Sequence, residues 1–555
     1  MEFDFTGNGL KGKERRLQRF FEILPGATSW CILLGMIILA FFMPIAAAVI
    51  IIAFYLYWLV RLLYTTVFLV ISYFRLSLEK KSDWMARIRG LDDMDNYIRK
   101  LEETPPEGGL RKRLSAFIHL KTMKEIKSKH LRMPPSESIY HLVIIPIAKE
   151  TREVVEPGIR SLAEGTFPPA RILPVLAVEE RASGEVKEGA RGIVNEYRDR
   201  FKDMFIVEHP DGIPGEARVK GANAAFAAKK AAEDLSGKGI DTGNVIVSCF
   251  DSDTVVPPGY FAGLTYYYMT CPERERASFQ PVPVYNNNIW EAPGITRVLE
   301  TGSSFFQLIE ATNPEKLVTF SSHSMSFKAL VDVGYWPVDM ISDDSAIFWK
   351  AFVHYDGKYR VIPMYTTLSM DAVVADNWWQ TVVNVYKQKR RWAWGVENFP
   401  IVMRAFLRNK KIPVINKVKY AFKLFEGHTA WATWAFLLTI IGWLPAIFAG
   451  REFSHSVLYY SAPRITGIIF KLASVSLITS IVLSLRLLPK SGVKYPVMRK
   501  IGFALQWLLV PLTLVFLGAM PALDAQTRLM SARYMTFWVT DKSKFCKSKI
   551  CPKGR

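Results

Sequence analysis

A long, nearly unbroken apolar run lies close to the start of the chain. It covers residues 28–74 and is interrupted by Pro44 and Arg61. Since a membrane-spanning helix needs about 20 residues, this run predicts two spans joined by a tight turn near Pro44. We do not expect a signal peptide here, because the run is too long and no small-residue cleavage site follows it.

Three more long apolar runs occupy the C-terminal part of the chain, at residues 430–449, 465–488 and 501–520. The loop after the first run carries few charges and the loop after the second is basic, which predicts that the two loops lie on opposite sides of the membrane. Three spans would leave the basic tail outside. Pro511 and Pro521 would let the last run re-enter, so we expect five or six membrane elements in all.

Between these regions the apolar runs shorten to strand length. Four of them follow one another at residues 142–147, 171–178, 204–208 and 244–250. Helix-like stretches separate them, notably the alanine-rich segment 219–235. Strands that alternate with helices predict a parallel sheet covered on both faces, so we expect one α/β domain over residues 140–400.

The composition agrees with a sizeable soluble domain joined to membrane helices. Of the 555 residues, 50% are hydrophobic and 22% are charged, and the mean hydropathy is +0.12. These values exclude a disordered chain and are unlike those of an ordinary soluble enzyme. The five cysteines have no zinc-like spacing, and we expect reduced thiols in a protein that faces the cytosol.

The net charge of +20 is concentrated beside the apolar runs. Lysines and arginines gather at residues 11–19, 404–423, 490–500 and 542–555. This is the positive-inside pattern, strengthened by attraction to anionic headgroups, so the expected partner is a lipid bilayer and not nucleic acid. We expect a multi-pass protein of the cell membrane, plasma or inner, with its α/β domain and both termini in the cytosol.

Together these patterns divide the chain into seven segments. They are a basic cytosolic N-terminus (1–27), two membrane helices (28–74), interfacial or linker helices (75–139), the α/β domain (140–400), a basic interfacial segment (401–427), three to four membrane elements (428–522) and a basic cytosolic tail (523–555). Within the third segment, residues 84–98 resemble a helix lying on the membrane surface, and a solvated linker is an equal alternative.

Two aspartates directly follow the predicted strand 244–250, in the sequence Asp251-Ser252-Asp253. Open α/β sheets bind ligands at the carboxyl ends of their parallel strands. Two carboxylates at that position are suited to hold Mg²⁺ or Mn²⁺ against a diphosphate. Taken alone, however, Asp-x-Asp is common, and a solvated turn explains it better.

The Asp-x-Asp pair does not stand alone, because other motifs accompany it in order. They are Pro146 to Glu150, Glu179-Glu180, RVKGAN at 218–223, Ser342-Asp343-Asp344 and QKRRW at 388–392. With this set, residues 140–399 resemble the family-2 glycosyltransferases, membrane-embedded inverting enzymes that include cellulose, chitin and hyaluronan synthases. The resemblance implies a GT-A fold, the Rossmann-like mixed α/β sheet of nucleotide-diphospho-sugar transferases.

The resemblance further implies a nucleotide-sugar site at the first motifs. Pro146 and Glu150 match the family's opening turn, which lies beside the base and ribose. Glu180 stands where relatives carry an aspartate that contacts uracil or ribose, and the longer side chain leaves the base open. Arg218, or its neighbour Lys220, takes the place of a nucleotide-binding lysine.

In the family, the aspartates supply the metal ligands and the base. Asp251 would contact ribose or diphosphate and would coordinate the divalent cation together with Asp253. Asp343 and Asp344 match the family's Thr-Glu-Asp, which makes Asp344 the general base that takes the acceptor's proton. Direct attack needs no glycosyl-enzyme intermediate, so the configuration would invert. The alternative for this acidic pair is the first turn of a helix capped by Ser342, and both can hold together.

The QKRRW motif would complete the site. Arg391 would pair with the departing diphosphate, and Gln388 and Trp392 would bind the acceptor sugar. A basic amphipathic helix at the membrane interface explains part of the same pattern. His323 lies where relatives have a Gly-rich stretch and would touch the acceptor or a phosphate, with a structural histidine as the alternative.

We therefore expect a metal-dependent hexosyltransferase that uses a UDP- or GDP-sugar, extends a polysaccharide and exports it through its own helices, with accessory subunits as further partners. One alternative adds a single sugar to a polyprenyl phosphate or another lipid. A catalytically inactive scaffold or a transporter is disfavoured, because all the motif residues are present and the spans carry few charges. The segment FWVTDK at 537–542 resembles a family segment that approaches the site from the cytosol.

Overall fold

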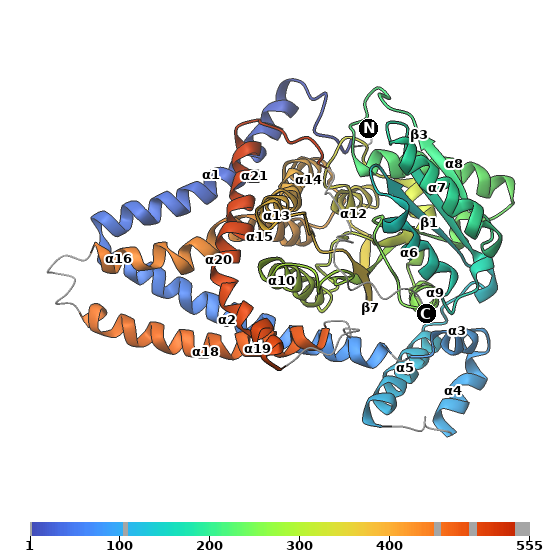
Figure 1. The fold of residues 1–555 in the computed structure, drawn as a ribbon, viewed down its shortest axis with the longest axis horizontal. Coiled ribbons are helices and arrows are strands. Elements are labelled where there is room, and N and C mark those ends of the chain that lie inside the picture. The colour runs from blue at the N-terminus through green and yellow to red at the C-terminus, as the bar shows by residue number, and fades with distance from the viewer. Residues whose placement is uncertain (1–2, 81, 104–108, 449–456, 488–496, 539–555) are drawn as a thin grey trace. The chain divides into compact units, whose positions relative to one another are not determined.

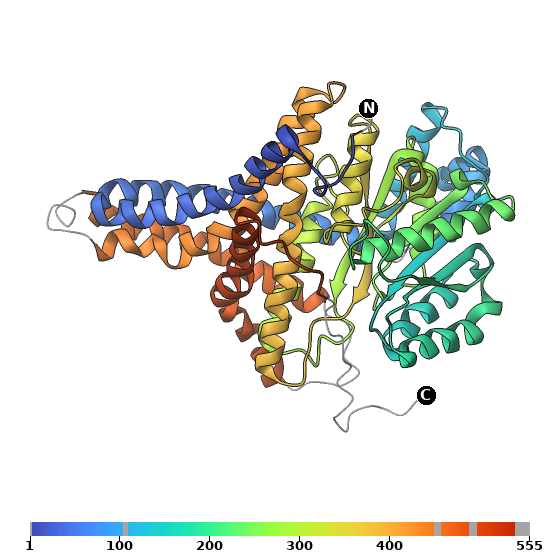
Figure 2. The same cartoon turned by 90° about the horizontal axis from the view of Figure 1, so that it is seen from above.

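The computed structural model describes residues 3–80, 82–103, 109–448, 457–487 and 497–538. The chain forms two compact units, each assembled from segments that are far apart in sequence (Figures 1 and 2). The first unit contains residues 1–6, 71–287 and 306–371, and the second contains residues 7–70, 288–305 and 372–555. The α/β unit thus takes in residues 71–139, while residues 288–305 and 372–400 belong to the helical unit.

The first unit is built on a seven-stranded mixed sheet with the order β3-β2-β1-β4-β6-β5-β7. Strands β1 and β2, β1 and β4, and β2 and β3 pair in parallel, as do β5 and β7, whereas β6 runs antiparallel to both β4 and β5. The sheet confirms the expected GT-A α/β class. Its strands are β1 (Tyr140–Ile147), β2 (Ile172–Glu179), β3 (Phe205–His209), β4 (Val245–Cys249), β5 (Ala277–Tyr285), β6 (Ser324–Ser326) and β7 (Arg360–Met370).

The four strands predicted from the sequence are β1 to β4. The apolar runs of β1, β2 and β4 are continuous because both faces of the sheet are covered there, whereas β3, at the edge of the sheet, is only partly buried. Every residue of β2 is buried. Figure 1 shows α6, α7 and α8 around this half of the sheet. Their bounds, with those of the other helices of this α/β region, are α6 (Arg152–Ala163), α7 (Gly184–Tyr197), α8 (Lys220–Gly237), α9 (Tyr260–Thr270), α11 (Phe327–Asp332) and α12 (Asp343–His354).

Residues 84–128 form three helices, α3 (Trp84–Asp92), α4 (Met94–Glu103) and α5 (Leu110–Ser128). The buried face of α3 is used inside the first unit: the Trp84 ring lies against Gly259 and Gly263 at the start of α9, and Ile88 is buried. Arg87 joins α3 to α5 by donating to Ser115 Oγ, and it also donates to Glu79, which precedes α3 in the chain. The helices predicted in this segment are therefore present, and α3 packs on protein.

The described residues of the second unit form helices and the turns between them. The helices are α1 (Gly12–Phe42), most of α2 (Pro44–Glu79), the first part of α10 (Gly294–Glu310), α13 (Trp378–Ala393), α14 (Asn398–Arg408), α15 (Val414–Thr439), α16 (Leu444–Ile447), α18 (Val457–Leu487), α19 (Val497–Leu505), α20 (Val510–Leu514) and α21 (Met520–Met530). In the view from above, α1 and α18 extend along the same direction (Figure 2).

Within the described residues, four helices are long and apolar enough to cross a membrane, and a fifth span results if α15 and the segment 441–447, bent by 45°, are one broken span. The predicted turn at Pro44 is confirmed, since α1 ends at Phe42 and α2 begins at Pro44. Helix α1 begins at Gly12, well before the apolar run. Arg61 of α2 pairs with Glu426 of α15, which offsets the cost of a charge within a span.

Candidate functional site

Three charged side chains from three elements meet beyond the carboxyl end of β4. Lys220 Nζ donates to Asp251 Oδ1 at 2.7 Å and to Asp344 Oδ1 at 2.9 Å. Lys220 begins α8, Asp251 follows β4, and Asp344 lies in the first turn of α12. Each carboxylate keeps 24% of its side chain exposed, whereas the lysine keeps 11%. The Asp-x-Asp motif, the acidic pair and RVKGAN are therefore neighbours in the folded chain.

The two carboxylates keep this lysine charged. Burial lowers the pKa of Lys220, but the negative charges of Asp251 and Asp344 outweigh it and raise that pKa well above its usual value. The ammonium group in turn partly neutralises two carboxylates that would otherwise repel each other. One positive charge therefore offsets part of the negative charge of these two carboxylates.

Gly221 explains how α8 comes close enough for this contact. A Cβ at Gly221 would lie 2.5 Å from Pro337 O and 2.8 Å from Asp343 Cβ, distances that only a missing side chain permits. Asn223, 1% exposed, fixes the same turn by donating from Nδ2 to Ala177 O of β2 at 2.8 Å. The small residue and the amide in RVKGAN thus serve to place Lys220.

The two aspartates of Asp-x-Asp differ in their surroundings. Asp251 Oδ2 accepts a hydrogen bond from Ser321 Oγ at 2.6 Å. Asp253 is 2% exposed, and its Oδ2 accepts from the backbone N of Asp371 at 3.0 Å. Ser322 accepts from Asp251 N through its Oγ at 3.1 Å, and its φ of 58° lies in the left-handed region.

The carboxylate oxygens of Asp251 and Asp253 are chemically suited to bind a hard divalent cation. Carboxylate oxygens are the ligands that Mg²⁺ and Mn²⁺ prefer, and Mg²⁺ usually takes one or two carboxylates together with substrate phosphates and water. No group of three metal-binding side chains gathers anywhere in the described ranges. Asp251 and Asp253 would therefore leave most of the coordination sphere to a diphosphate and to water.

Asp343 and Asp344 open α12, as the alternative reading of the acidic pair predicted, but the Ser342 side chain makes no capping hydrogen bond. Beside Asp344 lies His323, which is fully buried. The ring Nδ1 of His323 lies 3.0 Å from Phe320 O and 3.8 Å from Asp344 Oδ1. Burial lowers the pKa of His323, so a neutral ring donates from Nδ1 to that carbonyl. A contact with acceptor or phosphate stays a prediction.

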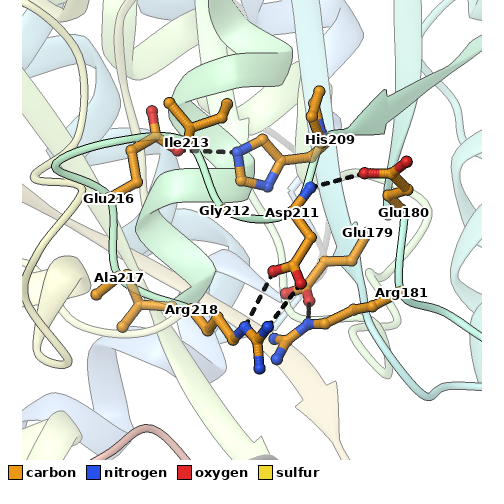
Figure 3. Close-up of a pocket in the computed structure, with 12 residues that line it drawn as sticks. Glu179, Glu180, Arg181, His209, Asp211, Gly212, Ile213, Glu216, Ala217 and Arg218 are labelled. Atoms are coloured by element: carbon orange, nitrogen blue, oxygen red, sulfur yellow. Dashed lines mark hydrogen bonds and ion pairs between the residues drawn. The ribbon is translucent and has the colours of Figure 1, made fainter.

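A pocket lies beyond the carboxyl ends of β2 and β3 (Figure 3). Glu180 reaches across it, its Oε2 accepting from Asp211 N at 2.8 Å. Arg218 forms a two-pronged ion pair with Asp211, at 2.9 and 2.6 Å, and this bond lowers the pKa of Asp211. Arg218 and Lys220 thus have different places: Arg218 lines the pocket, and Lys220 joins the carboxylates.

The opening turn after β1 is closed by its own glutamate. Glu150 Oε2 accepts from the backbone N atoms of Ala148 and Lys149 at 2.8 and 3.0 Å. Pro146 lies in β1 opposite Ala177 of β2. Since β1 is the neighbour of both β2 and β4, this turn follows the strand between the pocket and Asp251.

The QKRRW residues lie on α13 in the second unit. Gln388 is 6% exposed, and within the described residues its Oε1 has no hydrogen-bond partner. The Arg391 guanidinium lies 5.3 Å from the centre of the Phe537 ring, and Lys387 Nζ lies at the same distance from the Trp538 ring. The first two residues of FWVTDK therefore contact this helix, and residues 539–542 lie outside the described part of the chain.

Sequence reasoning missed several polar residues that support these groups. Ser321 and Asp371 hold the carboxylates of Asp251 and Asp253, and Asn287 Nδ2 donates to Asp253 O at 3.0 Å. Ser321 could have been found from the sequence, because it lies two positions before His323, which the sequence singled out. Asn287 and Asp371 follow β5 and β7, two strands that the apolar pattern did not reveal.

Comparison with known proteins adds a family. Residues 246–520 match the family model described as glycosyl transferase family group 2. A segment of 89 residues is 36% identical to the poly-beta-1,6-N-acetyl-D-glucosamine synthase of Staphylococcus aureus (strain COL), covering 16% of this chain and 19% of that protein. The chain thus matches about a fifth of the length of the curated relatives.

Two solved structures are similar at low identity. The mannosyltransferase PcManGT from Pyrobaculum calidifontis, in complex with GDP-Man and Mn2+, matches 66% of this chain and 94% of that chain, with 17% identity and a TM-score of 0.37. S. aureus TarS 1-349, in complex with UDP-GlcNAc, matches 71% and 91%, with 12% identity and a TM-score of 0.35.

Proposed function

We propose that the chain, whose residues 246–520 match the model of glycosyl transferase family group 2, is a membrane-integrated, inverting hexosyltransferase that moves sugar from a nucleotide-sugar to a growing polysaccharide. One observation carries the proposal: Lys220 joins Asp251 of Asp-x-Asp to Asp344 of the acidic pair. A donor-binding carboxylate and a base are thereby within one side chain's reach of each other, as sugar transfer from a bound diphosphate requires.

In this proposal the pocket of Figure 3 receives the nucleoside of a UDP- or GDP-sugar. Glu180 would accept hydrogen bonds from the base or ribose, and Pro146 and Glu150 would border them. Arg218 would lie at the rim beside its partner Asp211. Lys220 and Asp251 would then contact the diphosphate side of the donor.

Asp251 and Asp253 would hold Mg²⁺ or Mn²⁺, which supplies positive charge to the diphosphate as it leaves. Arg391 would add a guanidinium suited to the same oxygens. Asp344 would take the proton of the acceptor hydroxyl at a carboxylate oxygen, aided by Asp343 beside it in the turn. Because the hydroxyl attacks directly and no sugar becomes attached to the protein, the anomeric configuration inverts.

Gln388 and Trp392 would bind the acceptor, the amide to hydroxyls and the indole to a sugar face. The relative named a poly-beta-1,6-N-acetyl-D-glucosamine synthase supports a polysaccharide product. The helices that could span a membrane support a multi-pass location, with the α/β unit on the cytosolic side where nucleotide-sugars are supplied. Processive extension and export through the chain's own helices are part of the proposal.

The experiment that tests it uses the purified full chain with Asp344→Asn. Nucleotide release and sugar incorporation are measured with UDP- and GDP-sugars and Mn²⁺, and donor binding is measured separately. We expect incorporation to disappear while donor binding persists. Wild-type incorporation by Asp344→Asn would contradict the assignment of the base.

A further inference from the structure

A buried ion pair joins two helices of the second unit beside the QKRRW motif. Lys389 of α13 and Glu300 of α10 keep 3% and 1% of their side chains exposed, and Nζ lies 2.9 Å from Oε2. The same Nζ donates to Ser303 Oγ at 2.9 Å. The pair connects positions that are 89 residues apart in sequence, so it fixes how α10 and α13 pack.

Stability alone is a poor reason for this pair. Removing two charges from water is costly, and well-packed apolar side chains of similar volume are often at least as stabilising. The buried stripe of α13 includes Thr381, Val385 and Ala393, among which a lysine is conspicuous. Burial lowers the pKa of Lys389, while the charge of Glu300 opposes that shift and favours the ammonium form.

The ammonium group of Lys389 also contacts an aromatic ring of the QKRRW motif, and this contact indicates a role beyond stability. Lys389 Nζ lies 3.6 Å from the centre of the Trp392 ring. The two residues are three positions apart on one helix, so they lie on neighbouring turns of the same side. A desolvated cation over an indole face is attracted to the ring's π electrons and holds its plane. Gln388, buried immediately before Lys389, shares this turn.

We propose that Glu300 is a positioning residue of the acceptor site: through Lys389 it fixes the plane of Trp392 on which the acceptor sugar stacks. The inference rests on the proposed function, since it takes Trp392 as an acceptor residue. Glu300 touches neither donor nor acceptor and acts through the lysine. Its loss therefore changes how well an acceptor competes with water for the activated sugar.

The test uses the full chain purified in detergent and compares two reactions of the nucleotide-sugar: hydrolysis by water and transfer of the sugar to product. The probe is whichever of UDP-GlcNAc, UDP-glucose and GDP-mannose gives the most nucleotide release with Mn²⁺. Sugar freed by hydrolysis and sugar incorporated into product are measured in the same reaction. A purely structural loss lowers both together, whereas a misplaced acceptor lowers incorporation relative to hydrolysis.

We expect Glu300→Gln and Lys389→Met each to lower the ratio of incorporation to hydrolysis about tenfold, which is less than the roughly 10²-fold that a 1 Å misplacement of a reactant can cost. Ser303→Ala leaves the ion pair in place, and we expect a loss of about twofold. The double variant E300Q/K389M should be no worse than either single variant, because both act through one contact.

The double variant also guards against misfolding. It removes both charges at similar volume and so leaves no unpaired buried charge, even where a single variant fails to fold. A folded double variant with the wild-type ratio would overturn the role of Glu300. Trp392→Ala distinguishes the acceptor role of Trp392 from the positioning role of Glu300. A wild-type ratio of incorporation to hydrolysis in Trp392→Ala contradicts the acceptor role. A reduced ratio in Trp392→Ala, together with a wild-type ratio in the double variant, contradicts only the positioning role.

Discussion

Lys220 Nζ lies 2.9 Å from Asp344 Oδ1, although the two residues are 124 positions apart in the sequence. The same ammonium group donates to Asp251 at 2.7 Å. One cation, 11% exposed, therefore couples the residue proposed as the base to the residue proposed to bind the donor. Substitutions at these positions should separate binding from chemistry.

Asp344→Asn keeps the side chain's shape and removes its capacity to take a proton. We expect turnover to fall by about 10²–10⁴-fold, the usual contribution of a general base, while the donor dissociation constant changes little. Isothermal titration with the donor and a sugar-incorporation assay measure the two quantities. Asp332→Asn is the matched control, because Asp332 pairs with Lys328 on α11 and should keep full turnover.

Asp253→Ala removes a carboxylate proposed to coordinate the cation. We expect Mn²⁺-dependent donor binding to be lost, whereas the weak binding that remains in excess EDTA should match that of the wild-type protein. Titration of the donor with Mn²⁺ and with EDTA measures both. Equal gains in affinity from Mn²⁺ in the variant and the wild type would rule Asp253 out as a ligand.

Gly221→Ala tests whether close packing places Lys220. The added Cβ would lie 2.5 Å from Pro337 O, so the start of α8 must shift, and we expect a loss of about 1–3 kcal/mol in stability together with weaker donor binding. Gly237→Ala, at the other end of α8, meets nothing within 4 Å and is the control. If both variants bind the donor equally well, the close approach at Gly221 has no functional role.

His141 gives the α/β unit a pH-dependent stability. Burial, with a smaller effect of Arg171, lowers its pKa from 6.5 to about 3, so the folded state holds the ring neutral while the unfolded chain takes up a proton below pH 6.5. This contribution is fully present above pH 6.5 and is lost as the pH falls towards 3, on the order of 5 kcal/mol. Melting temperatures from pH 7 to 4 should fall less for His141→Gln. If the melting temperatures of the wild type and of His141→Gln fall equally with pH, His141 is not a source of the pH dependence.

The sequence predicted the strands and helices whose residue pattern can be recognised within the element itself. Strands β1 to β4 are continuous apolar runs, and α8 is rich in alanine, so their pattern reveals them directly. Strands β5 and β7 contain Pro281, Pro283 and Pro363, which weaken a strand pattern, and β6 is three residues long. Of these three strands, β6 runs antiparallel to both of its neighbours, which makes the sheet mixed.

The candidate site, too, was predicted only as far as local sequence patterns allow. Motif order identified Asp251, Asp253 and Asp344, but it could not decide between Arg218 and Lys220, since both are cations two positions apart. Folding separates them, because one points to Asp211 and the other to the carboxylates. Glu300 carried no signal at all, because its partner Lys389 is 89 positions away.

The central claim is most directly tested by nucleotide release from the purified full chain, measured over UDP- and GDP-sugars with Mn²⁺ or Mg²⁺, with product size read on the same samples. The account predicts release with one donor, dependent on the cation, together with a long product formed without added lipid. A single sugar transferred only after a polyprenyl phosphate is added would contradict polysaccharide extension. No release with any donor or acceptor would contradict the proposed enzyme.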